Sequence, residues 1–176
     1  MGTSRRPEIF RENTPGIIHN NEALMQWLEA KGFFTAPAST KYHGDYEGGL
    51  FDHSMAVALA LQEYTDKLGL RWVRRESPMI VGWFHDLCKI DQYIKTNEPG
   101  KYAYNDRPLI KGHGEKSIVY LSQFMTLTME EIMCIRYHMG AFISEEMNDY
   151  SRAVEEFPNV LYTHTADMAA SKIQRV

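Results

Sequence analysis

The apolar run from Met79 to Phe84 ends in two groups that are costly to bury, His85 and Asp86, with Lys89 one helical turn beyond His85. An ionised carboxylate that leaves water must find a partner or lose its charge. The expected partner is a cation, so Asp86 is predicted to be both a ligand and a catalytic group. Lys89 is predicted to contact an anionic group of a substrate or to protonate a leaving group, with a solvated lysine at a helix end as the alternative.

Other histidine and aspartate side chains that could bind a metal ion occur in separate segments of the chain. Divalent cations bind several imidazole and carboxylate ligands at about 2 Å. A donor set without thiolate suits one or two ions of Mn, Fe, Co, Ni or Zn, which would lower the pKa of a bound water and supply hydroxide. The predicted metal ligands are His53, His85, Asp86, His113, His138 and Asp167.

Only helices brought together in one domain could join these residues. Apolar periodicity and capping signals predict helices over 21–31, 51–68, 77–90, 112–126, 128–138 and 159–173, with one short helix in 140–157. Aromatic and polar residues alternate around "EPGK", which predicts a small hairpin or an irregular excursion near 93–108. The expectation is a single, mostly α-helical domain over 1–176, with its motifs in 43–171.

The helix expected over 51–68 carries the spacing of a buried face. The stripe His53, Val57, Leu61, Tyr64 and Leu68 follows the helical repeat. Asp52 is the expected N-cap of this helix, as Ser77 is of the next, while Thr128 and Glu131 form the expected capping box of 128–138. The pattern places His53 in the core, where a leucine would otherwise be usual.

Composition limits the partners. The 176 residues are 44% hydrophobic with a net charge of −4, which disfavours broad binding to nucleic acid. The 2 cysteines are too few for a disulfide framework, and no signal peptide or membrane span is recognised, so a cytoplasmic protein without membrane contact is expected. The 10 methionines and many aromatic residues leave enough apolar surface for a homodimer.

The motifs "GGLFDHS", "HDLCK", "KGHGEKS", "IRYHMG" and "HTADMAAS" together resemble the HD superfamily of metal-dependent phosphohydrolases. The resemblance implies an all-α HD-domain helical bundle. It implies that one ion is held by His53, His85, Asp86 and Asp167. A second ion would add His113 and His138, with Asp86 between the two.

Two branches of that superfamily show the greatest local likeness. "HGDYEGGLFDH" resembles the 3′–5′ exoribonucleases, and "HDLCK" resembles the HD-GYP phosphodiesterases. The nucleic-acid-binding OB domain of the former has no counterpart here, Met139 replaces the second of two paired histidines, and no GYP triplet is found. Short nucleic acid and cyclic dinucleotides are therefore not the favoured substrates.

The function expected from these observations is hydrolysis of a small phosphorylated substrate, such as a nucleotide, by a phosphomonoesterase or phosphodiesterase. Two alternatives stay open, an HD-type di-iron oxygenase with the same ligand set and a non-catalytic nucleotide-binding regulatory module. The expected substrate contacts are Lys89, His43, Tyr46 and Lys111, with Lys116 as a further phosphate contact. Cys88 and Cys134 are interpreted as small buried apolar residues.

Overall fold

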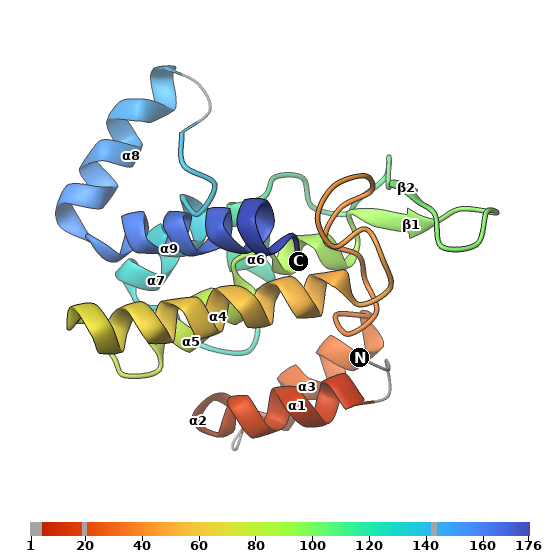
Figure 1. Ribbon diagram of the computed structural model, residues 1–176, viewed down its shortest axis with the longest axis horizontal. Helices are drawn as coiled ribbons and strands as arrows, with labels where there is room; N and C mark the ends of the chain where they lie inside the picture. The colour runs from red at the N-terminus through yellow and green to blue at the C-terminus, as the bar shows by residue number, and fades with distance from the viewer. Residues whose placement is uncertain (1–4, 19–20, 142–143) are drawn as a thin grey trace.

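The computed structural model describes residues 5–18, 21–141 and 144–176 (Figure 1). The predicted all-α architecture with a small hairpin is confirmed. Helices α4 and α9 lie side by side, α1 and α3 lie on one side of α4, and the hairpin projects at one end (Figure 1). The helices are α1 (Arg6–Asn13), α2 (Pro15–Ile18), α3 (Glu22–Ala30), α4 (Gly49–Leu68), α5 (Ser77–Phe84), η2 (Leu87–Ile90), α6 (Gly114–Leu121), α7 (Met129–Arg136), α8 (Ser144–Glu156), α9 (Asn159–Met168) and η3 (Ala169–Gln174).

The hairpin lies within the predicted range. Strands β1 (Tyr93–Lys95) and β2 (Tyr102–Tyr104) pair antiparallel, with Tyr93 opposite Tyr104. Lys95 in β1 forms an ion pair with Glu47, 3.3 Å from Nζ to Oε2, which ties the hairpin to the loop before α4. Within the described ranges, these are the only two strands.

Helix α4 begins earlier than expected, and Asp52 is not its N-cap. Gly48 takes that position with φ of 86°, in the left-handed region that a glycine adopts freely. The Asp52 carboxylate instead accepts two hydrogen bonds from the buried Arg6 guanidinium, at 3.1 and 3.0 Å. The prediction failed because a long-range ion pair used the side chain that a local cap would need.

The predicted buried stripe of α4 is confirmed over its first two-thirds. His53, Val57 and Leu61 are fully buried and Tyr64 is partly buried, whereas Leu68 is 58% exposed. Leu68 is the last residue of α4, immediately before Gly69, and this end of the helix extends beyond the hydrophobic core. The prediction that this residue is buried is therefore wrong.

The helix predicted over 77–90 is interrupted. The α-helical part ends at Phe84, and Leu87–Ile90 form a 3₁₀ helix (η2) after a change of backbone conformation at Asp86, where φ is −104° and ψ is 18°. Ser77 is the first helical residue rather than the N-cap, which is Glu76. The break lies at the two residues that the sequence marks as costly to bury.

The remaining helices agree with the sequence, with shorter bounds. The Thr128–Glu131 capping box opens α7 as predicted. Helix α6 begins at Gly114 and ends at Leu121, inside the predicted 112–126. The final helix changes from α to π geometry at Ala169, and residues 142–143 of the segment preceding α8 lie outside the described residues.

Helices α4 and α5 approach each other closely at Gly82. A Cβ built on Gly82 would lie 2.3 Å from Cα of Ala58, so only glycine permits this contact. Gly82 is one turn before His85, and Ala58 is slightly more than one turn after His53. The close contact therefore sets the distance between the two histidines.

Gly82→Ala is expected to destabilise the fold by about 1–3 kcal/mol, because the added methyl group must push α4 away from α5. The separation of His53 from His85 should also weaken metal binding. Urea unfolding and metal titration measure the two effects. The control is Gly16→Ala, whose Cβ would meet only the Glu76 side chain, with Cγ nearest at 3.5 Å. Equal stability of the two variants would contradict this account of the helix contact.

None of the helices that the structure describes is both long enough and apolar enough to cross a membrane.

Candidate metal centre

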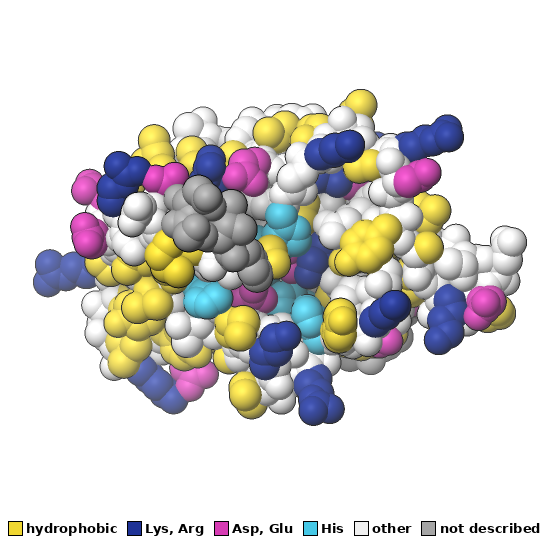
Figure 2. All heavy atoms as spheres, turned by 90° about the horizontal axis from the view of Figure 1, so that it is seen from above, with side chains coloured by type: hydrophobic (Ala, Val, Ile, Leu, Met, Phe, Trp, Pro, Cys, Tyr) yellow, Lys and Arg dark blue, Asp and Glu magenta, His cyan; other side chains and the backbone are white. Residues whose placement is uncertain are grey.

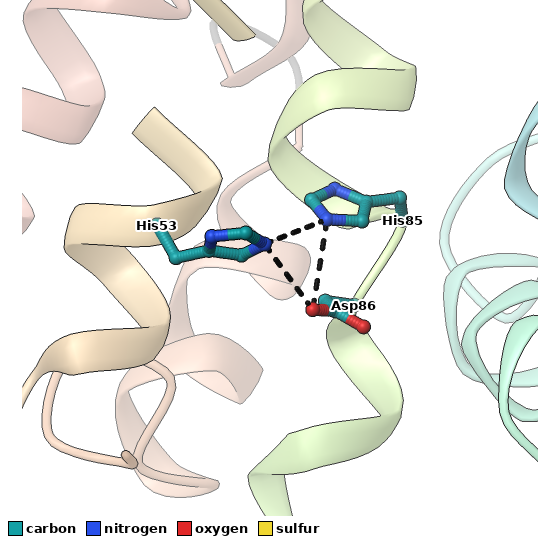
Figure 3. Close-up of side chains that lie close together, drawn as sticks. All are labelled: His53, His85 and Asp86. Atoms are coloured by element: carbon teal, nitrogen blue, oxygen red, sulfur yellow. Dashed lines mark hydrogen bonds and ion pairs between the residues drawn. The ribbon is translucent and has the colours of Figure 1, made fainter. Parts of the chain in front are cut away.

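Four of the predicted ligands, His53 among them, form one compact group, of which Figure 3 shows His53, His85 and Asp86. His53 projects from α4 toward His85 and Asp86 at the end of α5. The Nε2 atom of His53 lies 3.2 Å from Nε2 of His85 and 3.4 Å from Oδ2 of Asp86. Asp167 of α9 completes the group, with Oδ1 at 3.1 Å from the same nitrogen.

The other two predicted ligands lie on the opposite oxygen of Asp86. Oδ1 of Asp86 is 2.9 Å from Nε2 of His113 and 3.4 Å from Nε2 of His138. The first turn of α6 can approach the end of α7 because Gly114 has no Cβ. Such an atom would lie 2.6 Å from the carbonyl oxygen of Ile135. The structure therefore brings all six predicted ligands together, with Asp86 in contact with both groups.

Backbone carbonyls fix the orientation of three of the histidines. Nδ1 of His85 lies 2.8 Å from the carbonyl of Gly82, and Nδ1 of His138 lies 2.7 Å from that of Ile135. Nδ1 of His53 lies 3.0 Å from the carbonyl oxygen of Val176. A carbonyl can only accept, so each Nδ1 carries a proton and each Nε2 is directed into the centre.

The spacing of the four atoms fits a single ion. Ligand atoms about 2.1 Å from one ion lie about 3.0 Å apart at a right angle and about 4.2 Å apart on opposite sides. The distances from Nε2 of His85 to Oδ2 of Asp86 and Oδ1 of Asp167 are 3.6 and 4.0 Å. These separations, like those around His53, fall within the range that one ion permits.

Two buried polar atoms of the centre are without a well-formed hydrogen bond, even though Nε2 of His113 lies 2.9 Å from one of them, Oδ1 of Asp86. Oδ1 of Asp86 and Nε2 of His138 are buried and make no hydrogen bond of good geometry with any described residue, although they lie 3.4 Å apart. Buried polar atoms are rarely left in this state, and a bound ion would satisfy both of them. The buried His, Asp and Cys groups of this centre could therefore hold a metal ion.

The carboxylates of the centre remain ionised. Burial alone would raise the pKa of Asp86, but the positive charge of Lys89 outweighs it and holds the pKa well below its usual range. Burial also acts to raise the pKa of Asp167, and the hydrogen bond from His53 reverses the effect. Both carboxylates are therefore available as anionic ligands.

The two histidines of the first group differ in protonation. Burial lowers the pKa of His85 to about 3, so this imidazole stays neutral. Burial also acts to lower the pKa of His53, but hydrogen bonds to Asp167 and Asp86 outweigh it and raise the pKa. In the metal-free protein, His53 is therefore the histidine whose proton competes with an ion.

Metal affinity is expected to fall as the pH is lowered through the raised pKa of His53. Below that pKa, an ion must displace one proton, so affinity should decrease about tenfold per pH unit. Above it, the affinity should reach a plateau. Calorimetric titration of Mn²⁺ between about pH 5 and pH 8 measures this slope, and buffers of different ionisation enthalpy count the protons released. An affinity independent of pH across this range would contradict the assignment.

Lys89 is buried beside the carboxylate that links the two groups. Its ammonium group forms an ion pair with Oδ2 of Asp86, at 2.5 Å, and its side chain is only 9% exposed. Burial acts to lower the pKa of Lys89, but the charge of Asp86 outweighs it and raises the pKa. The alternative of a solvated lysine at a helix end is therefore wrong.

The remaining substrate candidates have different surroundings. The His43 ring lies 5.0 Å from that of His53, and burial together with the charge of Lys89 lowers its pKa to about 4. The Tyr46 hydroxyl donates to Asp52 at 3.0 Å, and Lys111 is exposed. Of the three, His43 is the one placed beside the centre.

Lys116 is not available as a phosphate contact. Its side chain is buried, and its ammonium group pairs with Asp91. Tyr120 of the same helix donates a hydrogen bond to that carboxylate at 2.8 Å. These contacts join α6 to the end of η2 and are structural.

Sequence reasoning missed the position of Cys88. The thiol is fully buried as expected, but Sγ also lies 3.2 Å from Nδ1 of His113. Burial raises its pKa to about 12, so the sulfur is a neutral thiol. The carbonyl of Val176 behind His53 was also missed, because contacts over 123 residues leave no local pattern.

Seen from above the view of Figure 1, histidine side chains gather near the middle of one face (Figure 2). Lysine and arginine side chains lie on the surface around them, together with several apolar groups.

Comparisons with known proteins leave the family open. No family model and no solved structure matches the chain. The chain is 28% identical over 165 residues to a glutamine–fructose-6-phosphate aminotransferase (isomerizing) of Clostridium acetobutylicum. The match covers 81% of this chain and spans 24% of the length of that relative. A likeness of this extent does not assign the chain to the aminotransferase family.

Proposed function

We propose that the chain is a metal-dependent phosphohydrolase acting on a nucleotide or another small phosphoester. The observation that carries the proposal is the meeting of four ligand atoms, from His53, His85, Asp86 and Asp167, beside the buried ammonium group of Lys89. A metal centre with an adjacent cation suits a dianionic or monoanionic phosphoryl group.

The six ligands would form two metal sites that share Asp86. His53, His85, Asp86 and Asp167 would hold one ion, while His113 and His138 would hold a second on the other oxygen of Asp86. When bound, one or two ions of Mn, Fe, Co, Ni or Zn would lower the pKa of water and reduce the negative charge of the phosphoryl group.

Lys89 would bind a phosphoryl oxygen once the charge of Asp86 is shared with an ion. The ammonium group is held at the centre before substrate arrives, so little reorganisation is needed. His43, whose lowered pKa keeps it neutral, is placed to donate or accept a hydrogen bond at the edge of the same centre. Both contacts favour an anionic substrate over a neutral one.

Substrate class is tested on protein freed of metal by chelation and reloaded with each of the five metals. Release of nitrophenol from a phosphomonoester and a phosphodiester, and of phosphate from 5′-nucleotides, is measured under nitrogen and then in air. Turnover that is equal in both atmospheres supports hydrolysis. Oxygen uptake with no phosphoester cleavage would support a di-iron oxygenase instead, and fully loaded protein without either activity would indicate a regulatory module.

A further inference from the structure

The His113 ring has a different partner from the other three histidines of the centre. Behind His53, His85 and His138, the atom facing Nδ1 is a backbone carbonyl oxygen. Behind His113 it is Sγ of Cys88, at 3.2 Å. A thiol sulfur can accept a hydrogen bond, although more weakly than a carbonyl. The Cys88 sulfur therefore faces Nδ1 of His113 in the position that a backbone carbonyl takes at the other three histidines.

The structure holds this sulfur firmly in place. Cys88 lies in η2, and its backbone N–H donates to Oγ of Ser117 on α6 at 2.9 Å. Both residues are fully buried. The His113 side chain is 26% exposed, whereas those of His53 and His138 are at most 1% exposed. The imidazole with the least packing around it is the one that depends on a side-chain contact.

We propose that Cys88 is a positioning residue for His113. Its sulfur contacts Nδ1 and turns Nε2 toward Oδ1 of Asp86, and it would accept the Nδ1–H hydrogen bond when Nε2 holds an ion. The inference rests on the two-ion centre of the proposed function, because it requires His113 to be a ligand.

A different role, with the Cys88 sulfur as a ligand itself, fits the geometry less well. Ligand atoms of Asp86, Cys88 and His113 do lie within 4.8 Å of one another. However, the sulfur faces Nδ1 and the carboxylate faces Nε2. One imidazole offers only one nitrogen to one ion, so the two contacts point to different atoms of the ring.

The weak acceptor has a consequence for the order of binding. A carbonyl behind the ring makes an imidazole ligand more basic and better fixed, and a thiol does so less. The ion held by His113 and His138 should therefore bind more weakly than the ion held by His53, His85 and Asp167. Two ions should bind in two separate steps.

The test is a Co²⁺ titration of metal-free protein followed by calorimetry and absorption. Cys88→Ala should weaken the second step about 10–100-fold and leave the first unchanged. Cys88→Ser, which restores an acceptor, should recover part of the loss. Cys134→Ala is the matched control, since this other buried cysteine lies in α7 and its loss should lower stability without changing either affinity.

Four results would overturn the inference. These are equal losses in both steps, the same losses in Cys134→Ala, a sulfur-to-cobalt charge-transfer band that Cys88→Ala removes, or wild-type binding that stops at one ion. Nitrogen NMR of the Zn²⁺-loaded protein adds a readout at the ring itself, because His113 is expected to bind through Nε2 and to keep its proton on Nδ1, facing the sulfur. A proton found on Nε2 would also overturn it. None of these readouts needs turnover, so failure of the proposed reaction is distinguished from failure of this inference.

Discussion

Replacing Asp86 with asparagine is expected to remove both metal positions and to lower phosphoester hydrolysis more than about 100-fold. Loss of a group that only orients a metal ligand already costs up to about 100-fold, and Asp86 would be a ligand itself. Oδ2 of Asp86 faces His53, and Oδ1 faces His113. The amide is neutral and retains only one oxygen, so neither side keeps its anionic ligand. Metal content after dialysis and the rate with a nitrophenyl phosphoester measure the two effects.

The matched control is Asp52→Asn. Asp52 is the residue before His53, but its carboxylate pairs with Arg6. The control should lose some stability and keep both metal content and activity. An Asp86→Asn protein that binds ions as well as Asp52→Asn does would contradict the assignment of Asp86 as the shared ligand.

Replacing Lys89 with methionine is expected to lower kcat about 100-fold or more while metal binding is retained or strengthened. Removing a preorganised cation from a developing phosphoryl charge costs about 10²–10³ in rate. The substitution also removes the ammonium group that competes with an ion for Oδ2 of Asp86. Steady-state kinetics and metal titration on the same preparation separate the two effects.

Lys116→Met is the control for this prediction, since it removes another buried lysine, one paired with Asp91 outside the centre. Its cost should appear in the free energy of unfolding and leave kcat nearly unchanged. If Lys89→Met lost its metal and kept the kcat of the fraction still loaded, Lys89 would be a structural group and its role in the reaction would be wrong.

Much of the centre could be predicted from the sequence, because several of its ligands lie at positions that a helical repeat, a buried carboxylate or a capping box marks. The helical repeat put His53 on the buried face of α4, and the structure has it fully buried. The cost of burying a carboxylate singled out Asp86 before any fold was known. The capping box at Thr128 fixed the start of α7, and His138 follows its end by two residues.

The parts that could not be predicted depend on long-range contacts. The Arg6–Asp52 pair joins residues 46 apart and displaced the expected N-cap. The interruption at Asp86 reflects packing of η2 against α6, where Ser117 accepts from the backbone of Cys88. No local pattern carries either contact.

Apolar periodicity also could not distinguish which loop groups reach the centre. His43 lies beside His53, whereas the hydroxyl of Tyr46, only three residues further along the chain, is engaged by Asp52. In an irregular loop, the direction in which side chains project changes from residue to residue without a fixed period. Neither the α-helical nor the β-strand repeat can therefore predict it.

The most direct test of the account is the initial rate of phosphoester hydrolysis under nitrogen as metal ions are added back to chelated protein. The account predicts no turnover without metal and a rate that rises with bound metal. It also predicts that Asp86→Asn stays inactive at every metal concentration. Protein with a fully loaded His53–His85–Asp86–Asp167 site that cleaves neither a phosphomonoester, a phosphodiester nor a nucleotide would contradict it.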